Sequence, residues 1–178
     1  MNGAAGSPTS SERDRALGAL QGLAIGDALG MPFQLLHRDE VRAGWGAIVG
    51  GFAAPAADHP LAGGMPPGAI TDDTEQALLV ARLLIEGEGS IAPATLAREL
   101  VAWEDDMRGR GSTDLLGPST TRAVRAVLRG EPIETAGRTG TTNGAAMRIA
   151  PVGIATPGAD VGRLLDAVEA ASAVTHAT

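Results

Sequence analysis

The segment PPGAITDDTEQALLVARLL, residues 66–84, is the most informative stretch of this chain. After its Gly/Pro-rich start, apolar residues recur at helical spacing, which predicts a helix from about Thr71 to about Glu86. Either Thr71 or Asp72 could cap this helix, and Asp72 with Glu75 fits a capping box. The predicted apolar face comprises Ala77, Val80, Ala81 and Leu84.

Two neighbouring carboxylates, Asp72 and Asp73, follow Thr71 at the start of this helix. A helix N-terminus favours negative charge, so spacing alone favours an ordinary capped helix start. A bound cation is the alternative, because adjacent carboxylates in an enclosed site repel one another and a cation removes that cost. Oxygen ligands of this type suit Mg²⁺ or Mn²⁺ rather than zinc.

The rest of the sequence also reads as helices joined by loops, which indicates an all-α fold. Pro118 suits the first turn of a helix, and Gly130 lies just past the expected end of that helix. The segment AIVGGF, residues 47–52, is a weak candidate for a strand. We expect a flexible tail over 1–12, loops over 44–70 and 137–144, and helices over 14–29, 93–106, 118–128, from about 145, and over 160–174.

Residues 16–36 are nearly apolar, but Asp27 in their middle argues against a membrane span and for a buried core helix. Gly18, Gly22 and Gly26 form a stripe on this helix that would let a neighbouring backbone approach closely. We therefore expect no association with a membrane.

Composition and charge narrow the class of protein further. Aromatic residues make up only 2% of the 178 residues, so the core must be built from Ala, Leu, Val and Ile, which suits closely packed helices in one domain. The net charge of −7 argues against nucleic-acid binding. All 14 basic residues are Arg, and many lie between residues 98 and 148. They leave room for a small anionic ligand, although solvated helix faces are the simpler explanation.

Five blocks of sequence, in order, resemble the ADP-ribosylglycohydrolase family. They are GALQGLAIGDALGMPFQ (18–34), GAITDDTEQALLVARLL (68–84), GPSTTRAV (117–124), TTNGAAMRIAPVGI (141–154) and VTHAT (174–178). The resemblance implies a compact orthogonal bundle of helices, all-α, which binds two divalent ions, Mg²⁺ or Mn²⁺, in a cleft. It implies a glycosidase-type, cytoplasmic hydrolase that cleaves the C1″ bond of ADP-ribosylated protein or of a small ADP-ribose-like ligand.

The resemblance also assigns roles to individual residues. Thr71, Asp72 and Asp73 match metal ligands, and either aspartate could act as general base toward a water molecule. Asp27 matches an aspartate beside the site and is assigned a supporting role, with the capping of a neighbouring helix as the alternative.

Substrate-binding positions come from three further blocks. Asn143 and Gly144 match a loop that contacts ribose or phosphate, although Asn-Gly is also a common turn. Gly117 and Ser119 match a loop near the substrate, with a helix start as the alternative explanation. His176 matches a histidine near the distal part of the ligand. Met147 and Arg148 are expected to pack beneath the Asn-Gly loop, whereas His37 and His59 are expected at the surface.

Two departures from the family pattern qualify this interpretation. Gln34 stands where many relatives have a glutamate, and an amide can neither take up a proton nor carry a full negative charge. The family's second group of metal ligands, an Asp-x-Asp-(Thr/Ser) block, does not occur in this chain. We therefore expect 13–178 to form the N-terminal part of one domain, with the remainder missing or on a second chain, and the isolated chain to be inactive.

Three alternatives remain open at this stage. The substrate could be a smaller ribosyl compound, or the protein could be a catalytically inert ligand-binding member of the same fold. A helical nucleotide-binding module is a third alternative, but the sequence contains no Walker pattern.

Overall fold

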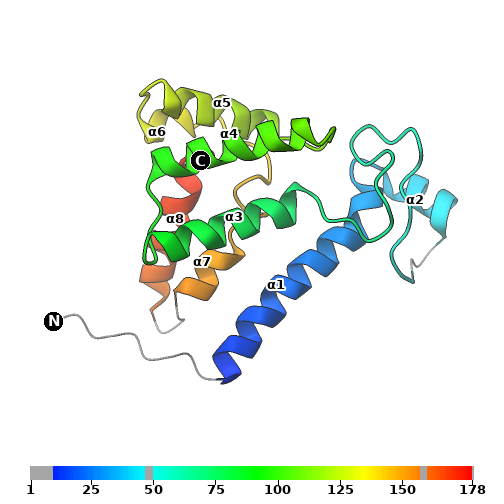
Figure 1. The fold of residues 1–178 in the computed structure, drawn as a ribbon, viewed down its shortest axis with the longest axis horizontal. Helices are drawn as coiled ribbons and strands as arrows, with labels where there is room; N and C mark the ends of the chain where they lie inside the picture. The colour runs from blue at the N-terminus through cyan, green and yellow to red at the C-terminus, as the bar shows by residue number, and fades with distance from the viewer. Residues whose placement is uncertain (1–9, 47–49, 157–159, 178) are drawn as a thin grey trace.

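Helices are the regular elements of the computed structural model, which describes residues 10–46, 50–156 and 160–177 (Figure 1). The described residues contain no strand, so the predicted all-α class is confirmed. The elements are α1 (Ser10–Gly30), the 3-10 turn η1 (Met31–Phe33), α2 (Arg38–Trp45), α3 (Asp72–Glu86), α4 (Pro93–Gly109), α5 (Pro118–Leu128), α6 (Ile133–Ala136), α7 (Ala150–Ala155) and α8 (Val161–Ala173).

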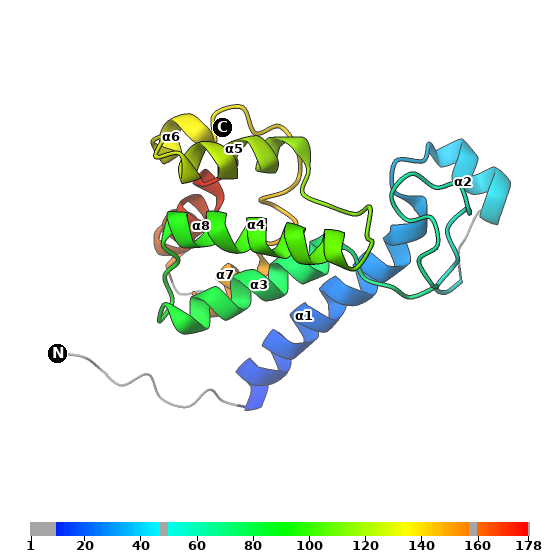
Figure 2. The same cartoon turned by 45° about the horizontal axis from the view of Figure 1, so that its top comes forward.

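Helix α3 lies at the centre of the arrangement and contacts α1, α4 and α7. In both views α4 lies between α5 and α3, and α1 crosses the far side of α3 (Figures 1 and 2). Helix α6 packs on α5, and α8 packs on α7. The N-terminal end of α3, which carries the aspartates, points toward the end of α1 that leads into α2 (Figure 1).

The core between α3, α4, α5 and α7 is aliphatic, as the low aromatic content predicts. Leu96 and Leu100 of α4 are 0% exposed, and they pack with Val80 and Leu83 of α3. Trp103 is the one aromatic side chain in this core cluster of the described residues. Burying branched aliphatic side chains gives each about 1.5–3 kcal/mol, which holds the two helices together.

Local signals place several helix ends where the sequence predicts them. Helix α5 begins at Pro118 and ends at Leu128, and Gly130 adopts φ +89° directly after it. The Asp160 side chain caps α8 by accepting hydrogen bonds from the backbone N–H groups of Gly162 at 3.0 Å and Arg163 at 3.3 Å.

Other local predictions are wrong. Helix α1 begins at Ser10, so 10–12 are helical rather than part of a tail, whereas 1–9 lie outside the described residues. The helix expected from about 145 begins at Ala150, because Pro151 occupies its first turn and 144–148 form turns. Of the candidate strand, 47–49 lie outside the described residues and 50–52 are not a strand.

The prediction of a buried core helix in this part of the chain is wrong, because Ala28 is the one buried residue of α1. A Cβ added at Gly18, Gly22 or Gly26 would meet nothing within 4 Å, so no described backbone uses the glycine stripe. Large exposed apolar side chains lie on α1, α7 and α8, and others lie elsewhere on the described surface; those of the three helices are Leu17, Ile25, Leu29, Ile154, Val161 and Leu165. Within the described residues, no helix is long and apolar enough to cross a membrane.

The two histidines expected at the surface differ in the structure. His37 is exposed and caps α2. His59 is only 6% exposed, so its surface prediction is wrong. Its Nδ1 accepts hydrogen bonds from the N–H groups of Leu61 at 3.2 Å and Ala62 at 2.9 Å, which leaves Nε2 to donate to the Gln34 carbonyl at 2.8 Å. His59 thereby fastens the loop before α3 to the turn after η1.

Candidate functional site

The carboxylate of Asp27 joins α1 to the start of α3. It accepts hydrogen bonds from the Thr71 N–H at 2.8 Å and the Thr71 hydroxyl at 2.7 Å. It also accepts from the Thr74 N–H at 3.2 Å and the Thr74 hydroxyl at 2.5 Å. These contacts correspond to the helix-capping alternative for Asp27, and they place the residue directly beside the predicted metal ligands.

The cap of α3 is Thr71, whose side-chain oxygen accepts a hydrogen bond from the Asp73 N–H at 3.3 Å. The capping box between Asp72 and Glu75 does not form. Instead, Glu75 Oε2 accepts hydrogen bonds from Trp103 Nε1 at 2.7 Å and from Arg110 Nη2 at 3.0 Å. Thr71 and Asp27 already accept hydrogen bonds from backbone N–H groups at the start of α3. Asp72 and Asp73 are therefore not needed as caps.

Asp114, which the sequence analysis did not select, belongs to the same cluster. Its side chain is 3% exposed and accepts a hydrogen bond from the Asp72 N–H at 2.9 Å. On the other side, Gln76 Nε2 donates to the Asp72 carboxylate at 3.2 Å. In the sequence, Asp114 is only a single aspartate in a loop, followed by two leucines. Its partner Asp72 lies 42 residues away, so no local pattern indicates the contact.

The proximity of these acids perturbs their protonation. Burial, together with the negative charges of Asp114 and Asp73, raises the pKa of Asp72 to about 8. Burial raises the pKa of Asp73, with a further contribution from Asp27. Burial also raises the pKa of Asp114, and Asp27 and Asp73 add to it. Such a cluster is unfavourable in its ionised form unless a positive charge compensates it.

A surface cavity of about 460 Å³ opens beside the cluster. Its polar lining consists of Asp27, Gln34, Thr71, Asp73 and Asn143. The cavity therefore brings together residues predicted from three of the sequence blocks. Asp72 does not line it, so the two neighbouring aspartates face different surroundings. The Gln34 amide nitrogen is buried and has no hydrogen-bond partner in the described part of the chain.

The side chains of this cluster have the oxygen donors that a hard divalent cation prefers, but they do not form a complete coordination site. Thr71, Asp72 and Asp73 offer oxygen donors, and the raised pKa values of the acids mark a place where positive charge is favoured. Within the described residues, no group of three or more His, Asp or Glu side chains is arranged so that it could hold a metal ion unaided.

A buried arginine connects this cluster to the segment that contains His176. Arg148 is 1% exposed, whereas Met147 is only partly buried. It donates through Nη1 to Gln76 Oε1 at 3.2 Å and through Nη2 to Thr175 Oγ1 at 2.5 Å. Thr175 Oγ1 in turn lies 2.8 Å from His176 Nδ1. The partial burial of His176 and the charge of Arg148 lower the pKa of that histidine.

The loop between α6 and α7 packs against the same histidine. The Thr142 hydroxyl lies 3.1 Å from His176 Nε2. A Cβ added at Gly144 would lie 2.8 Å from Thr120 Oγ1 and 3.2 Å from His176 Cε1, so the position has no room for a side chain. The Asn143 side chain is exposed at the cavity beside this buried glycine.

Gly117 and Ser119 lie at the start of α5, on the side of this loop. The Ser119 hydroxyl is buried and accepts a hydrogen bond from the Thr141 N–H at 3.3 Å. Gly117 precedes Pro118 as the N-cap residue, and a Cβ there would lie 3.9 Å from Thr142 Oγ1. Ser119, Gly144 and His176 therefore support the loop, whereas Asn143 faces the open cavity.

The profile of the ADP-ribosylglycohydrolase family matches residues 8–178. An uncharacterized protein, YegU, from Escherichia coli (strain K12) is 38% identical over 92% of this chain and 48% of its own length. The ADP-ribosyl-[dinitrogen reductase] glycohydrolase of Rhodospirillum rubrum is 34% identical over 83% of this chain and 47% of its own length. The ADP-ribosylarginine hydrolase Tri1 of Serratia proteamaculans (strain 568) is 33% identical, over 83% and 38% respectively.

The chain belongs to the ADP-ribosylglycohydrolase family, as the five sequence blocks predicted. It spans about half the length, or less, of the curated relatives it matches.

Proposed function

We propose that the protein is a divalent-metal-dependent hydrolase that cleaves the C1″ glycosidic bond of an ADP-ribosylated protein or a related ADP-riboside. The observation that carries this proposal is the group of aspartates at the start of α3, whose pKa values are raised, beside a cavity that also contains Asn143. Family membership supports a hydrolase of this type.

Thr71, Asp72 and Asp73 are the residues that would hold Mg²⁺ or Mn²⁺, with two ions in the complete site. When bound, such a cation lowers the pKa of water and orients sugar hydroxyls. It would also compensate the repulsion among the carboxylates, which favours their ionised form. Because the relatives are about twice as long or longer, we propose that further oxygen ligands come from sequence outside this chain.

Asp73 is the better placed of the two aspartates to take a proton from attacking water. Its side chain lines the cavity, whereas the Asp72 carboxylate accepts a hydrogen bond from Gln76 and lies next to Asp114. A general base must lie within hydrogen-bond reach of the proton it removes. We therefore assign the base to Asp73 and a ligand-holding role to Asp72.

Asn143 is the residue that would bind the ribose or phosphate, because it is exposed and lines the same cavity as Asp27 and Asp73. Gly117, Ser119, Gly144 and His176 would set the shape of the loop that presents it. The bond itself breaks through an oxocarbenium-like state, as in other glycoside cleavages.

A smaller ribosyl compound is a second candidate substrate, and Gln34 is the observation that favours it. Gln34 lines the cavity at the position where many relatives have a glutamate, and its amide can neither take up a proton nor carry a full negative charge. A cavity without that carboxylate is open to a different substrate. Comparing ADP-ribosylarginine with ribosylarginine as substrates separates the two candidates.

The test uses Asp72→Asn and Asp73→Asn in the full-length protein, with Asp166→Asn on the exposed surface of α8 as the control. We expect release of ADP-ribose from ADP-ribosylarginine, in the presence of Mg²⁺ or Mn²⁺, to fall at least about 100-fold in both site variants. The control should retain full activity. Unchanged turnover in both site variants would exclude the catalytic assignment. Absence of any metal-dependent heat in calorimetry would favour an inert member of the fold instead.

A further inference from the structure

The outward face of α5 concentrates positive charge in an acidic protein. Arg122, Arg125 and Arg129 follow one another at spacings of three and four residues, so they share one side of the helix. The opposite side carries the buried Ala123 and Val124, which pack toward α4. We refer to the three arginines as the α5 basic face. The whole chain carries a net charge of −7, which makes this face an exception.

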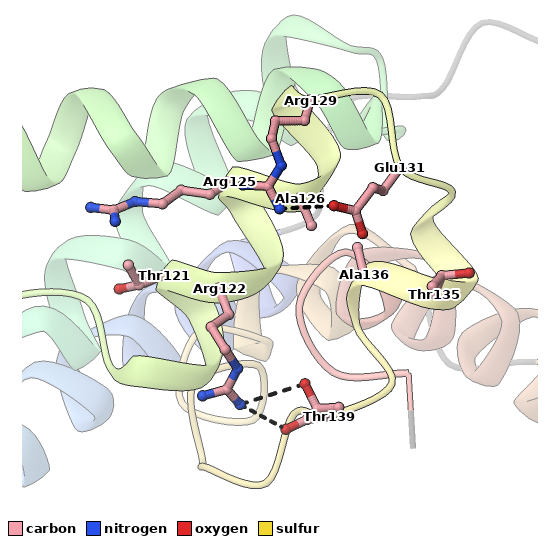
Figure 3. Close-up of a pocket in the computed structure, with 9 residues that line it drawn as sticks. All are labelled: Thr121, Arg122, Arg125, Ala126, Arg129, Glu131, Thr135, Ala136 and Thr139. Atoms are coloured by element: carbon pink, nitrogen blue, oxygen red, sulfur yellow. Dashed lines mark hydrogen bonds and ion pairs between the residues drawn. The ribbon is translucent and has the colours of Figure 1, made fainter.

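The three guanidinium groups differ in how they are held (Figure 3). Arg122 Nη2 donates to the Thr139 carbonyl at 3.2 Å, and Arg129 Nη2 pairs with Glu131 at 2.8 Å. Arg125 extends away from both, with no hydrogen bond or ion pair within the described part of the chain (Figure 3). Its charge is therefore uncompensated at the middle of the face.

Two hollows flank Arg125. One, of about 350 Å³, lies toward α6, and its charged lining is the basic face plus Glu131. The other, of about 290 Å³, lies toward α4, and its apolar lining includes Val101, Val124 and Leu128. Its lining also contains Glu104 and Asp105, which pair with Arg108 at 3.1 and 3.5 Å. Leu128 is 44% exposed at the edge of this hollow. Arg125 thus lines both a hollow formed by the basic face and a mixed hollow that contains apolar, acidic and basic side chains.

The geometry favours an extended ligand over a compact one. The guanidinium groups point in different directions rather than toward one point, as Figure 3 shows. A single phosphate group would need converging donors. A polypeptide segment with spaced carboxylates and an apolar side chain between them could instead contact Arg122, Arg125 and Leu128 together. Charge complementarity of this kind steers association and fixes orientation.

The basic face is continuous with the candidate site through one loop. The Thr139 carbonyl that Arg122 holds is four residues before Asn143, and the Thr141 N–H in between donates to Ser119 of α5. A protein bound to the basic face would therefore lie next to the loop that presents Asn143 to the cavity.

We propose that the α5 basic face docks an acidic, partly apolar segment of the protein from which ADP-ribose is removed. This inference rests on the proposed function for the identity of the partner, but the docking itself does not. Binding should weaken as ionic strength rises, because the exposed charges are screened beyond about 10 Å at 0.1 M salt.

The first experiment measures binding directly, by fluorescence anisotropy of a fluorescein-labelled peptide of alternating Glu and Leu. We expect Arg125→Glu/Arg129→Glu to weaken binding on the order of tenfold or more. The matched control is Arg98→Glu/Arg163→Glu, which makes the same change in net charge on α4 and α8 and should bind as the parent does. A peptide with Lys in place of Glu should not bind.

Three results would overturn the proposal: no binding of the acidic peptide to the parent protein, equal weakening in both double variants, or displacement of the peptide by inorganic pyrophosphate at equal concentration. The last result would assign the face to a small phosphate ligand instead. Circular dichroism of each variant verifies that the helices remain folded.

The second experiment compares hydrolysis of two ADP-ribosylated peptides, one with acidic and one with neutral flanking residues. We expect KM for the acidic peptide to rise in Arg125→Glu/Arg129→Glu with kcat unchanged, and neither constant to change for the neutral peptide. Absence of hydrolysis by the full-length parent protein would refute the proposed function, while the anisotropy result would still decide on docking. Equal KM values for both peptides in the parent protein would refute docking of the substrate and leave the proposed function intact.

Discussion

Arg148 and Gln76, which are 72 residues apart in the sequence, meet inside the fold at 3.2 Å. Gln76 uses its carbonyl oxygen for Arg148 and its amide nitrogen for Asp72, so one neutral side chain separates a buried cation from a buried acid. Burial lowers the pKa of Arg148 to about 10, and the negative charge of Asp72 opposes that change. Within the described residues Arg148 has neutral hydrogen-bond acceptors and no ion pair, so each acceptor matters.

Replacing Gln76 by Leu should destabilise the protein by about 1–3 kcal/mol. The substitution leaves an Arg148 N–H without its acceptor and removes the donor to Asp72. Urea-induced unfolding measures the change, and Gln21→Leu, on the exposed surface of α1, provides the control. Equal unfolding midpoints for Gln76→Leu and the parent protein would show that the bridge contributes nothing.

Stability in the absence of metal should fall as the pH rises between about 4 and 8. Over this range the folded protein keeps a proton on Asp72, whose pKa is about 8, while the unfolded chain, with a pKa of 3.8, has lost it. The stabilisation is complete below the unfolded pKa and is lost as the pH passes through the folded value, a change of a few kcal/mol. His176 contributes with the opposite sign, because its pKa is lowered on folding.

Comparing unfolding free energies of the parent protein and Asp72→Asn at about pH 5 and about pH 8.5 isolates the contribution of Asp72. The asparagine variant should show a flatter dependence on pH. Addition of Mn²⁺ should restore stability to the parent protein at the higher pH and have less effect on the variant. A parent protein that becomes more stable at the higher pH without metal would contradict the raised pKa.

Replacing Asp27 by Ala should cost about 2–4 kcal/mol, because the two threonine N–H groups and two hydroxyls that it serves lose their acceptor. Amide hydrogen exchange at Thr71 and Thr74 should become faster than in the parent protein. Asp14→Ala, on the exposed part of the same helix, should leave both amides protected. Unchanged protection in Asp27→Ala would mean that the start of α3 holds its shape without α1.

Gly144→Ala should destabilise the protein by about 1–3 kcal/mol, because the added Cβ would lie 2.8 Å from Thr120 Oγ1. Gly153→Ala is the matched control, since nothing lies within 4 Å of its added Cβ in α7. That control should be neutral or should stabilise the protein by up to about 1 kcal/mol. Calorimetric melting temperatures measure both changes, and similar shifts in the two variants would refute the tight packing around Gly144.

Much of the fold could be predicted from the sequence because local signals set it. Helices α3, α5 and α8 carry Thr71, Pro118 and Asp160 at their starts, and each begins at or within a residue of the predicted position. Helix α2 was not predicted because its cap is a histidine, His37, and because it is only eight residues long. Such a short segment shows too few apolar repeats to distinguish it from a loop.

The sequence predicted only some of the residues that form the site. Family blocks identify Thr71, Asp73 and Asn143, which the cavity brings together. Asp114 and the Gln76 bridge to Arg148 depend on contacts between elements, and neither leaves a spacing signal in the chain. The burial of His59 was not predicted although the turn that it supports is local, because histidine is intermediate between the residue types that are usually buried and those that are usually exposed.

The contacts of Asp27 and Asp114 have a consequence for how the family can vary. Both anchors of α3 come from other elements, and the stretch of chain just before Thr71 supplies neither. A change in the length of the connection that precedes α3, for example in the turn at Gly64, would therefore leave both anchors in place. A different connection would change the surroundings of Asp72 and Asp73 without changing their positions at the start of α3.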